Sequence, residues 1–322
     1  MSRSTGARVA LRDYHPQQES MRDAILEGLR LKQKTLPAFY FYDERGSQLF
    51  DQITELPEYY LTRTEISIMR EHGPEIGALI GEHASIIELG SGSSLKTRLL
   101  IDSLRKLAAY VPVEIARDQL MMAARSIAAD YPHVEVLPVC ADFSEPFDLP
   151  HPRVEPLRNL VYFPGSTIGN FRSHEAYDLL RAMRRIAAPG GALLIGVDLV
   201  KDRATLERAY NDSQGVTAEF NLNMFVRLNR ELDADFDLVA FRHRAVWNEA
   251  KSRIEMHLVS LRAQTVVVAG ESVDFRAGEY ILSECSYKYT PQGFAALAAE
   301  AGFAVRRVWT DPAGLFSVQY LE

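Results

Sequence analysis

The stretch Ala84-Ser-Ile-Ile-Glu-Leu-Gly90-Ser-Gly92-Ser93 decides the fold of this chain of 322 residues. It begins with a short apolar run and ends in a loop with two glycines. Glycine allows the backbone to turn sharply and to pass close to a ligand. In open α/β sheets such ligands bind at the carboxyl ends of the strands. We therefore predict a first core strand over 84–89 that leads into a ligand-binding loop.

Strand-like and helix-like segments alternate after this loop. The strand-like segments are short and almost wholly apolar, and the apolar residues of the helix-like segments recur every three or four positions. Strands of this kind are typical of a parallel sheet buried between two layers of helices, as in a doubly wound α/β fold. We predict further strands over 111–115, 134–139, 159–163 and 192–197, and helices over 96–107, 120–129 and 177–186.

The segments before the core read as two helices. Met21, Ile25 and Leu29 recur at helical spacing and indicate the first. Thr62-Arg-Thr-Glu65 fits a capping box at the start of the second, which we expect to end at Gly73-Pro74.

The pattern changes again after Asp198. Predicted elements are helices over 201–230, short alternating strands within 236–289 with turns at Gly270 and Gly278, a helix over 294–301, and a hairpin of 304–309 with 316–320. We therefore predict a core over 65–200 that 289–322 completes. Residues 1–64 and 201–288 would together form an inserted α+β domain that binds the substrate.

Composition excludes several classes of protein. The formal net charge of -7 argues against nucleic-acid binding, because phosphate contacts need a basic surface. No stretch approaches the roughly 20 apolar residues of a membrane span, and the first residues lack the apolar run of a secretory signal. Only two cysteines, Cys140 and Cys285, suggest a reducing compartment, so we expect a cytoplasmic protein. The eight scattered histidines show no metal-ligand spacing, and no obligate protein partner is evident.

Three classes of cofactor compete for the glycine loop. A dinucleotide loop requires Gly-x-Gly-x-x-Gly, and a P-loop requires a second glycine before Lys96, but Leu95 stands at both positions. S-adenosylmethionine has no phosphate and carries a positive sulfonium, so it suits acidic residues at strand ends. Glu88, Glu114 and Asp142 are such residues. Glu114 is placed to bind ribose and Asp142 to bind adenine, although both could instead cap helices.

A set of short segments along the chain forms a highly specific combination. These are Phe41-Tyr-Asp43, Gly46-Ser-x-Leu-Phe-Asp-Gln-Ile-Thr54, Leu56-Pro-Glu-Tyr-Tyr60, Arg63-Thr-Glu65, Glu88-Leu-Gly-Ser-Gly-Ser93, Gly165-Ser-Thr-Ile-Gly-Asn170, Val197-Asp-Leu-Val-Lys-Asp202, Tyr210-Asn-Asp-x-x-Gly-Val-Thr-x-x-Phe-Asn221 and Trp309-Thr-Asp-Pro-Ala-Gly314. In these segments the chain resembles the histidine-specific Nα-methyltransferases of ergothioneine biosynthesis. The resemblance extends from Tyr42 to Gly314 and implies a Rossmann-like class I methyltransferase core with S-adenosylmethionine as cofactor.

The resemblance also implies roles for individual residues. The implied cofactor contacts are Tyr42, Phe50, Gly90, Gly92, Lys96, Glu114, Asp142, Phe143 and Gly165. The implied substrate contacts are Tyr59, Asn170, Tyr210, Phe220, Met256, Glu284 and Ser286. Tyr59 and Asn170 would be the catalytic pair that holds the amine, and Glu284 would bind the imidazole with Ser286. The family often has Asp where this chain has Glu114, so the carboxylate here reaches one methylene further.

The implied reaction is trimethylation of the α-amino group of L-histidine to histidine betaine (hercynine). Two alternatives stay open: the same chemistry on another amino acid such as tryptophan, and a non-catalytic protein that binds an adenosyl ligand. Retention of Tyr59 and Asn170 argues against the second alternative. The carboxylate of Glu284 argues against the first, because it suits imidazole N–H donors better than indole. Without the resemblance, ordinary core residues would be the favoured interpretation of the aromatic residues in this set.

Overall fold

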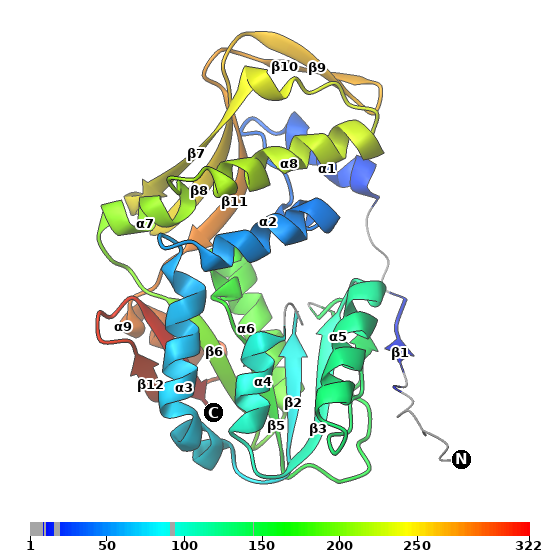
Figure 1. Ribbon diagram of the computed structural model, residues 1–322, viewed down its shortest axis with the longest axis vertical. Coiled ribbons are helices and arrows are strands. Elements are labelled where there is room, and N and C mark those ends of the chain that lie inside the picture. Colours follow the sequence, from blue (N-terminus) through cyan, green and yellow to red (C-terminus); the bar gives the residue numbers. More distant parts are fainter. Residues whose placement is uncertain (1–8, 10, 16–19, 91–93, 144) are drawn as a thin grey trace.

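The computed structural model describes residues 9, 11–15, 20–90, 94–143 and 145–322. Its largest element is an eight-stranded sheet with the order β1-β4-β3-β2-β5-β6-β13-β12 (Figure 1). The strands are β1 (Arg12–Asp13), β2 (Ala84–Leu89), β3 (Leu107–Glu114), β4 (Val139–Cys140), β5 (Arg158–Phe163), β6 (Ala192–Asp198), β12 (Val305–Thr310) and β13 (Phe316–Leu321). The strands from β1 to β6 pair in parallel, whereas β13 is antiparallel to both β6 and β12.

Helices cover both faces of this sheet. One face shares an apolar cluster with α3 (Tyr60–Ile80), α4 (Leu95–Asp102) and α5 (Arg117–Asp130). The other face shares a second cluster with α6 (Ser173–Ala187) and α9 (Pro291–Glu300). The strand order reverses between β2 and β5, and the carboxyl ends at such a switch point border the crevice where doubly wound sheets bind ligands. The predicted doubly wound α/β fold is confirmed.

A second group of elements lies beyond the carboxyl ends of the parallel strands (Figure 1). Between β6 and α9 the chain forms α7 (Arg203–Tyr210), α8 (Val216–Glu231), β7 (Phe241–Asn248), β8 (Arg253–Ser260), β9 (Gln264–Val268), β10 (Glu271–Phe275) and β11 (Tyr280–Tyr287). Strands β11, β8 and β7 form an antiparallel sheet, and β9 pairs with β10. From the N-terminal part, α1 (Met21–Arg30) and α2 (Glu44–Glu55) join this group, with α2 packed along α8.

Short 3-10 turns connect these elements: η1 (Ala38–Phe41), η2 (Thr167–Asn170), η3 (Leu238–Ala240) and η4 (Glu249–Lys251). The insertion of α+β elements between β6 and α9 agrees with the sequence analysis. The boundaries of the two predicted domains stay a prediction. Several contacts cross them, and one is a strand pairing: β1 from the N-terminal segment pairs with β4 at the edge of the large sheet.

The second helix begins near the predicted position, but its predicted capping box and its predicted end at Gly73-Pro74 are wrong. Helix α3 begins at Tyr60 without a side-chain cap and continues through Pro74 to Ile80. A proline inside a helix costs about 3 kcal/mol or more, because it removes a hydrogen bond. Close packing offsets this cost: a Cβ at Gly77 would lie 2.2 Å from the carbonyl oxygen of Ser103, so this turn of α3 lies directly against the chain that follows α4.

Two predicted strands also differ from the structure. The segment at 236–241 contains the 3-10 turn η3, and the strand begins only at Phe241. The strand predicted over 134–139 is reduced to β4, with one isolated bridge between Tyr110 and Val136. Segments this short carry too few residues for apolar periodicity to distinguish a strand from a turn.

Phe294 provides a test of whether α9 belongs to the core. Its side chain is wholly buried against the sheet, and its ring lies 5.4 Å from that of Tyr289. We expect Phe294→Ala to lower the free energy of unfolding by about 3–5 kcal/mol, because it leaves a cavity. Urea denaturation measures this loss. The exposed Gln292 on the same helix is the control, and Gln292→Ala should change stability by no more than about 0.5 kcal/mol. A loss below about 1 kcal/mol for Phe294→Ala would show that α9 is peripheral.

Candidate active site

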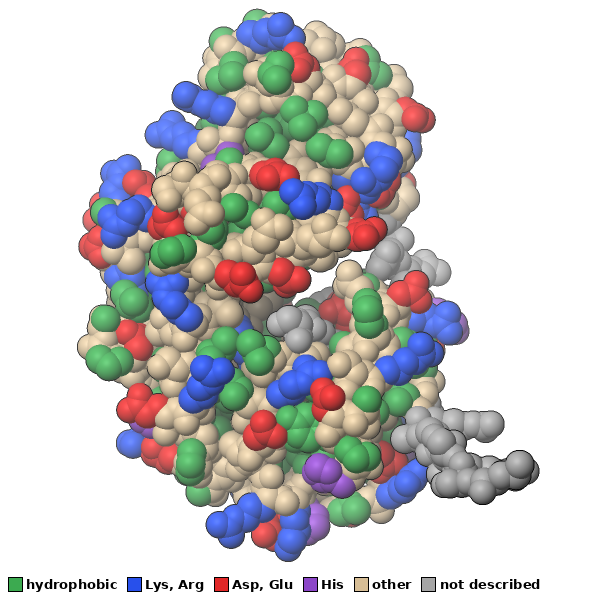
Figure 2. All heavy atoms as spheres, in the orientation of Figure 1, with side chains coloured by type: hydrophobic (Ala, Val, Ile, Leu, Met, Phe, Trp, Pro, Cys, Tyr) green, Lys and Arg blue, Asp and Glu red, His purple; other side chains and the backbone are tan. Residues whose placement is uncertain are grey.

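The predicted site residues come from both groups of elements, on either side of a surface hollow. Figure 2 shows this hollow between the part of the molecule that carries α2 and α8 and the part that carries the large sheet. Residues expected to bind the cofactor follow β2, β3, β4 and β5, whereas most of those expected to bind the substrate lie on α7, α8, β8 and β11. Four residues depart from this division: Tyr42 and Phe50, expected at the cofactor, lie at or on α2, and Tyr59 and Asn170, expected at the substrate, lie before α3 and at the end of η2.

Five predicted residues form one connected group of aromatic rings. Tyr42 and Phe50 are 5.5 Å apart between ring centroids, and they lie 5.8 and 6.1 Å from Phe220 on α8. Phe50 lies 6.4 Å from Tyr59, which in turn lies 6.1 Å from Tyr210. Tyr59 and Tyr210 are buried, whereas Tyr42 is 40% exposed. The group therefore joins residues predicted for cofactor and for substrate, and it opens to solvent at Tyr42.

Strand β11 contributes the polar residues beside these rings. Glu284 and Ser286 occupy alternate positions, so their side chains share one face of the strand. Met256 on β8 is the direct partner of Glu284 in the antiparallel register. Glu284 is half-buried, and burial raises its pKa to about 7 although the charge of Lys288 opposes the shift. Burial and then the charge of Glu284 raise the pKa of Tyr42, so this carboxyl group is close enough to the aromatic group to act on it electrostatically.

A buried ionic cluster, which the sequence analysis did not predict, lies behind Tyr210. The carboxylate of Asp198, at the end of β6, pairs with the ammonium groups of Lys288 at 2.7 Å and Lys201 at 2.6 Å. It also accepts a hydrogen bond of 2.9 Å from the hydroxyl of Tyr60. Burial lowers the pKa of Lys201 to about 8 despite the neighbouring carboxylate. Burial also acts to lower the pKa of Lys288. The negative charge of Asp198 has the larger combined effect with its other partners, so the pKa of Lys288 is raised.

Lys288 connects this cluster to two predicted substrate contacts. Its ammonium donates to the hydroxyl of Tyr210 at 3.0 Å and to that of Ser286 at 2.8 Å. The Tyr210 hydroxyl in turn donates to the Ser286 oxygen at 2.9 Å. The one signal for Lys288 in the sequence is its spacing. It follows Ser286 by two residues, just as Ser286 follows Glu284. Asp198 and Lys201 belong to a segment that the sequence analysis singled out without assigning them a role.

The loop after β5 uses Gly165 and Lys96 for an interaction within the protein. The backbone N–H of Gly165 donates to the carboxylate of Glu65 at 2.9 Å, and the Lys96 ammonium lies 2.5 Å from the same carboxylate. Glu65 is buried on α3, so this contact ties α3, α4 and the loop together. The expected cofactor contacts of Gly165 and Lys96 stay predictions. The structure gives both groups a partner in Glu65.

Asn170 ends the 3-10 turn η2, which packs on β11. A Cβ at Gly169 would lie 2.7 Å from the carbonyl oxygen of Tyr287, so the two backbones approach too closely for any larger residue. Asn170 itself is exposed. The glycine thus fixes the position of Asn170 relative to the strand that carries Glu284 and Ser286.

The carboxyl ends of β2, β3 and β4 carry the remaining predicted cofactor contacts. Gly90 has a φ of +78° and donates its N–H to the carbonyl of Val113 at 2.9 Å. Glu114 accepts hydrogen bonds from the backbone of Ile115 and Ala116, and burial raises its pKa. Asp142 and Phe143 follow β4, and Gly92 lies outside the described residues.

Glu88 does not join this edge. Its buried carboxylate accepts hydrogen bonds from Thr97 at 2.8 Å and from Tyr110 at 2.5 Å. Burial raises the pKa of Glu88 to about 7. Glu88 therefore has a structural role inside the core.

The residues at this edge fit S-adenosylmethionine better than a phosphate cofactor. A Cβ at Gly90 would meet no atom of the described residues within 4 Å. Among the described residues, no lysine or arginine forms an ion pair with Glu114. Its carboxylate can accept from ribose hydroxyls, whereas a phosphate would meet this acidic group without a paired cation. The ammonium of Lys96 is already held by Glu65.

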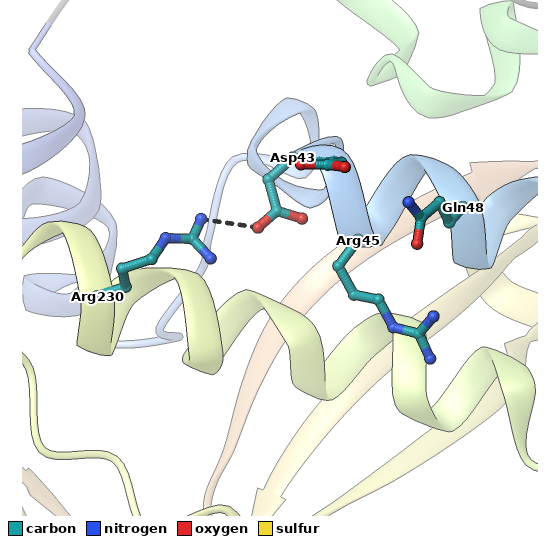
Figure 3. Close-up of a pocket in the computed structure, with 5 residues that line it drawn as sticks. Asp43, Arg45, Gln48 and Arg230 are labelled. Carbon is teal, nitrogen blue, oxygen red and sulfur yellow. Dashed lines mark hydrogen bonds and ion pairs between the residues drawn. The ribbon is translucent and has the colours of Figure 1, made fainter.

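A pocket of about 400 Å³ beside the start of α2 is distinct from this site (Figure 3). Asp43, Glu44, Arg45, Gln48 and Arg230 line it. Asp43 caps α2 and pairs with Arg230 at 2.8 Å, and Arg45 pairs with Glu219 on α8. These contacts hold α2 against α8, and none of the predicted site residues lines the pocket.

Two further properties concern only the part of the chain that the structure describes. None of its helices has the length and the apolar character needed to cross a membrane. Within the same residues, no group of three or more His, Cys, Asp and Glu side chains is arranged to hold a metal ion.

Comparison with known proteins identifies relatives along almost the whole chain. A family model described as histidine-specific, SAM-dependent methyltransferase matches residues 21–322. The histidine N-alpha-methyltransferase of Mycolicibacterium smegmatis is 46% identical over 306 residues, which cover 93% of this chain and 94% of that protein. Ergothioneine biosynthesis protein 1 of Neurospora crassa is 32% identical over 86% of this chain and 32% of its own length. A 4-dimethylallyltryptophan N-methyltransferase of Aspergillus fumigatus is 27% identical over 92% of this chain and 91% of that protein.

The family match and the mycobacterial relative each span more than nine-tenths of the chain. They confirm the predicted class of enzyme, an N-methyltransferase, and the predicted cofactor, S-adenosylmethionine. The chain belongs to the family of histidine-specific, S-adenosylmethionine-dependent methyltransferases.

Proposed function

We propose that this enzyme transfers three methyl groups in succession to the α-amino group of L-histidine, giving histidine betaine for ergothioneine biosynthesis. The observation that carries the substrate assignment is the half-buried carboxyl group of Glu284, which shares a face of β11 with Ser286 beside the aromatic group. A carboxylate there is an acceptor for an imidazole N–H. The names of the mycobacterial and fungal relatives support the same substrate and pathway.

The proposed roles of the residues follow from what methyl transfer requires. When bound, S-adenosylmethionine would supply an electrophilic methyl group on a sulfonium, for which the leaving group is a neutral thioether. Because that leaving group needs little acid assistance, the main task of the protein is to orient the amine. Good orientation can contribute on the order of 7–11 kcal/mol. Tyr59 and Asn170 are the proposed hydrogen-bonding partners of the nitrogen, and Gly169 fixes the backbone that carries Asn170.

The aromatic group suits a substrate whose amine becomes a permanent cation. Aromatic faces attract cations, and quaternary ammonium groups are often bound among such rings. Tyr59 and Tyr210 contact each other edge to face, and Phe50 and Phe220 continue the group towards Tyr42. We propose that these rings hold the amine as its methyl groups accumulate, with Glu114 and Asp142 holding the adenosyl part of the cofactor.

An amine of an indole amino acid is the second candidate substrate, because a relative named for dimethylallyltryptophan aligns with nearly the whole chain. Glu284 argues against it, since an indole offers one N–H in a bulkier ring.

We further propose that the enzyme acts in the cytoplasm without an obligate protein partner. Its two cysteines, Cys140 and Cys285, are both free, which is consistent with a reducing compartment. Residues 1–64 with 201–288 are the proposed substrate domain.

The substrate assignment is tested by incubating the enzyme and S-adenosylmethionine with histidine, tryptophan and phenylalanine. Mass spectrometry should show one, two and three added methyl groups on histidine and little on the others. Glu284→Ala should weaken kcat/KM for histidine by about 1.5–3 kcal/mol, the usual contribution of a hydrogen bond to a charged group. The KM for S-adenosylmethionine is the control and should change far less. Histidine methylation by Glu284→Ala at the wild-type rate would remove Glu284 as the imidazole contact.

The pH dependence of histidine methylation provides a separate test of Glu284. Its carboxyl group has a pKa of about 7 and is protonated at lower pH, where it is no longer an anionic acceptor. The ratio of wild-type kcat/KM to that of Glu284→Gln should therefore be constant above about pH 8 and fall as the pH decreases through 7. Ionisation of the α-amino group of histidine affects both enzymes equally and cancels in this ratio, and ionisation of the imidazole cancels as long as both enzymes act on its neutral form. A ratio that does not change between pH 5.5 and 8.5 would contradict the proposed role.

Glu114 tests the placement of the cofactor. Glu114→Ala removes the proposed acceptor of ribose hydroxyls, so we expect KM for S-adenosylmethionine to rise about tenfold or more. The KM for histidine should change much less. Glu145 is exposed and lies after β4, so Glu145→Ala serves as the charge-matched control. Equal cofactor KM values for Glu114→Ala and wild type would show that the ribose is bound elsewhere.

A further inference from the structure

Three alternate residues of the chain at β11 form a polar row: Glu284, Ser286 and Lys288. Lys288 stands just after the end of β11, and its side chain has no exposed surface. An ammonium group has three hydrogens to donate and no lone pair with which to accept. The three partners of Lys288 are Asp198 at 2.7 Å, Ser286 at 2.8 Å and Tyr210 at 3.0 Å. All three of its hydrogens are therefore committed.

This arrangement determines the direction of the neighbouring hydrogen bonds. The Tyr210 hydroxyl accepts from Lys288 and donates to the Ser286 oxygen at 2.9 Å. The Ser286 oxygen thus accepts two hydrogen bonds, which occupy its two lone pairs. The hydrogen of Ser286 has to be donated to a group outside the cluster. If the bond between the two hydroxyls ran the other way, one hydroxyl hydrogen would still be left to donate outward.

We propose that Lys288 is a positioning residue that fixes the Ser286 hydroxyl as a hydrogen-bond donor towards the substrate ring. Glu284, two residues away on the same face, is the acceptor. A donor beside an acceptor matches a neutral imidazole, which has one N–H and one bare nitrogen. Phenyl rings offer neither group, and indole lacks the bare nitrogen. This inference rests on the proposed function, because it takes histidine as the substrate.

Lys201 provides a matched control for Lys288. Both lysines pair with Asp198 inside the same cluster. Lys201, however, donates to the hydroxyl of Tyr60 at 2.6 Å, and its other partner is a backbone carbonyl. It has no hydrogen bond to Ser286 or Tyr210 among the described contacts. Loss of either lysine removes one ion pair from Asp198, but only the loss of Lys288 removes the charged donor from Ser286 and leaves it with Tyr210 alone.

The test measures the affinity for histidine by calorimetry with S-adenosylhomocysteine present. We expect Lys288→Met to weaken histidine binding about 10- to 100-fold, the range for a hydrogen-bond network that loses its charged donor. Ser286→Ala should weaken it about tenfold. Lys288 acts through Ser286, so the two losses should not multiply. The double variant should bind histidine no more than about threefold less tightly than whichever single variant, Lys288→Met or Ser286→Ala, has the lower affinity. Lys201→Met should change histidine affinity less than threefold, and all variants should bind S-adenosylhomocysteine as wild type does.

Thermal melting shows whether each variant is folded. If Lys288→Met is unfolded, Lys288→Gln replaces it, since a carboxamide lacks the charge but is polar, and a loss of at least fivefold is expected. A folded Lys288 variant that binds histidine as wild type does would overturn the proposal. So would equal losses in Lys288→Met and Lys201→Met, or losses that multiply in the double variant. Failure of the wild-type enzyme to bind or methylate histidine would instead overturn the proposed function.

Discussion

The structure depends on keeping one carboxylate, that of Asp198, charged in the interior. An isolated ionised carboxylate in an apolar interior would cost tens of kcal/mol, so it is tolerated only with well-placed partners. Those partners come from three different places: Tyr60 from α3, Lys201 from the chain after β6, and Lys288 from the chain after β11. Satisfying a single charge thereby fixes how the helix layer, the large sheet and the inserted sheet meet. The aromatic rings and the polar row of β11 lie directly on this junction.

Glu65 performs the corresponding task nearer to the glycine loop. It is almost wholly buried and binds Lys96 from α4 and the N–H of Gly165 after β5. A Cβ at Gly196 on β6 would lie 2.2 Å from its carboxylate, so a glycine in the central sheet makes room for it. Two buried carboxylates, one with two lysine partners and one with a single lysine partner, thus tie together the elements around the site. Each arrangement is costly to break, because removal of one partner leaves a charge unpaired in the interior.

Elements with a long, regular pattern could be predicted from the sequence. The apolar strands β2, β5 and β6 and the helices between them were found, since their periodicity reflects burial on both faces. Helix α3 was predicted too short, because its passage through Pro74 depends on contacts with Ser103 that local sequence does not reveal. Of the candidate site, the aromatic residues and Glu284 followed from family resemblance. Lys288 did not, because its role arises from a partner, Asp198, that lies 90 positions earlier in the chain.

The inserted segment leaves and rejoins the core at neighbouring points. Leu199 and Tyr289 form a backbone bridge, and the N–H of Tyr289 donates to the carbonyl of Asp198. The two ends of this inserted segment of about ninety residues therefore lie as close together as neighbouring strands of a sheet. Evolution can therefore replace or reshape what lies between these ends without changing the spacing of β6 and α9. The same geometry makes the segment a natural unit for building chimaeras, in which a recognition module from one relative is grafted onto the cofactor half of another.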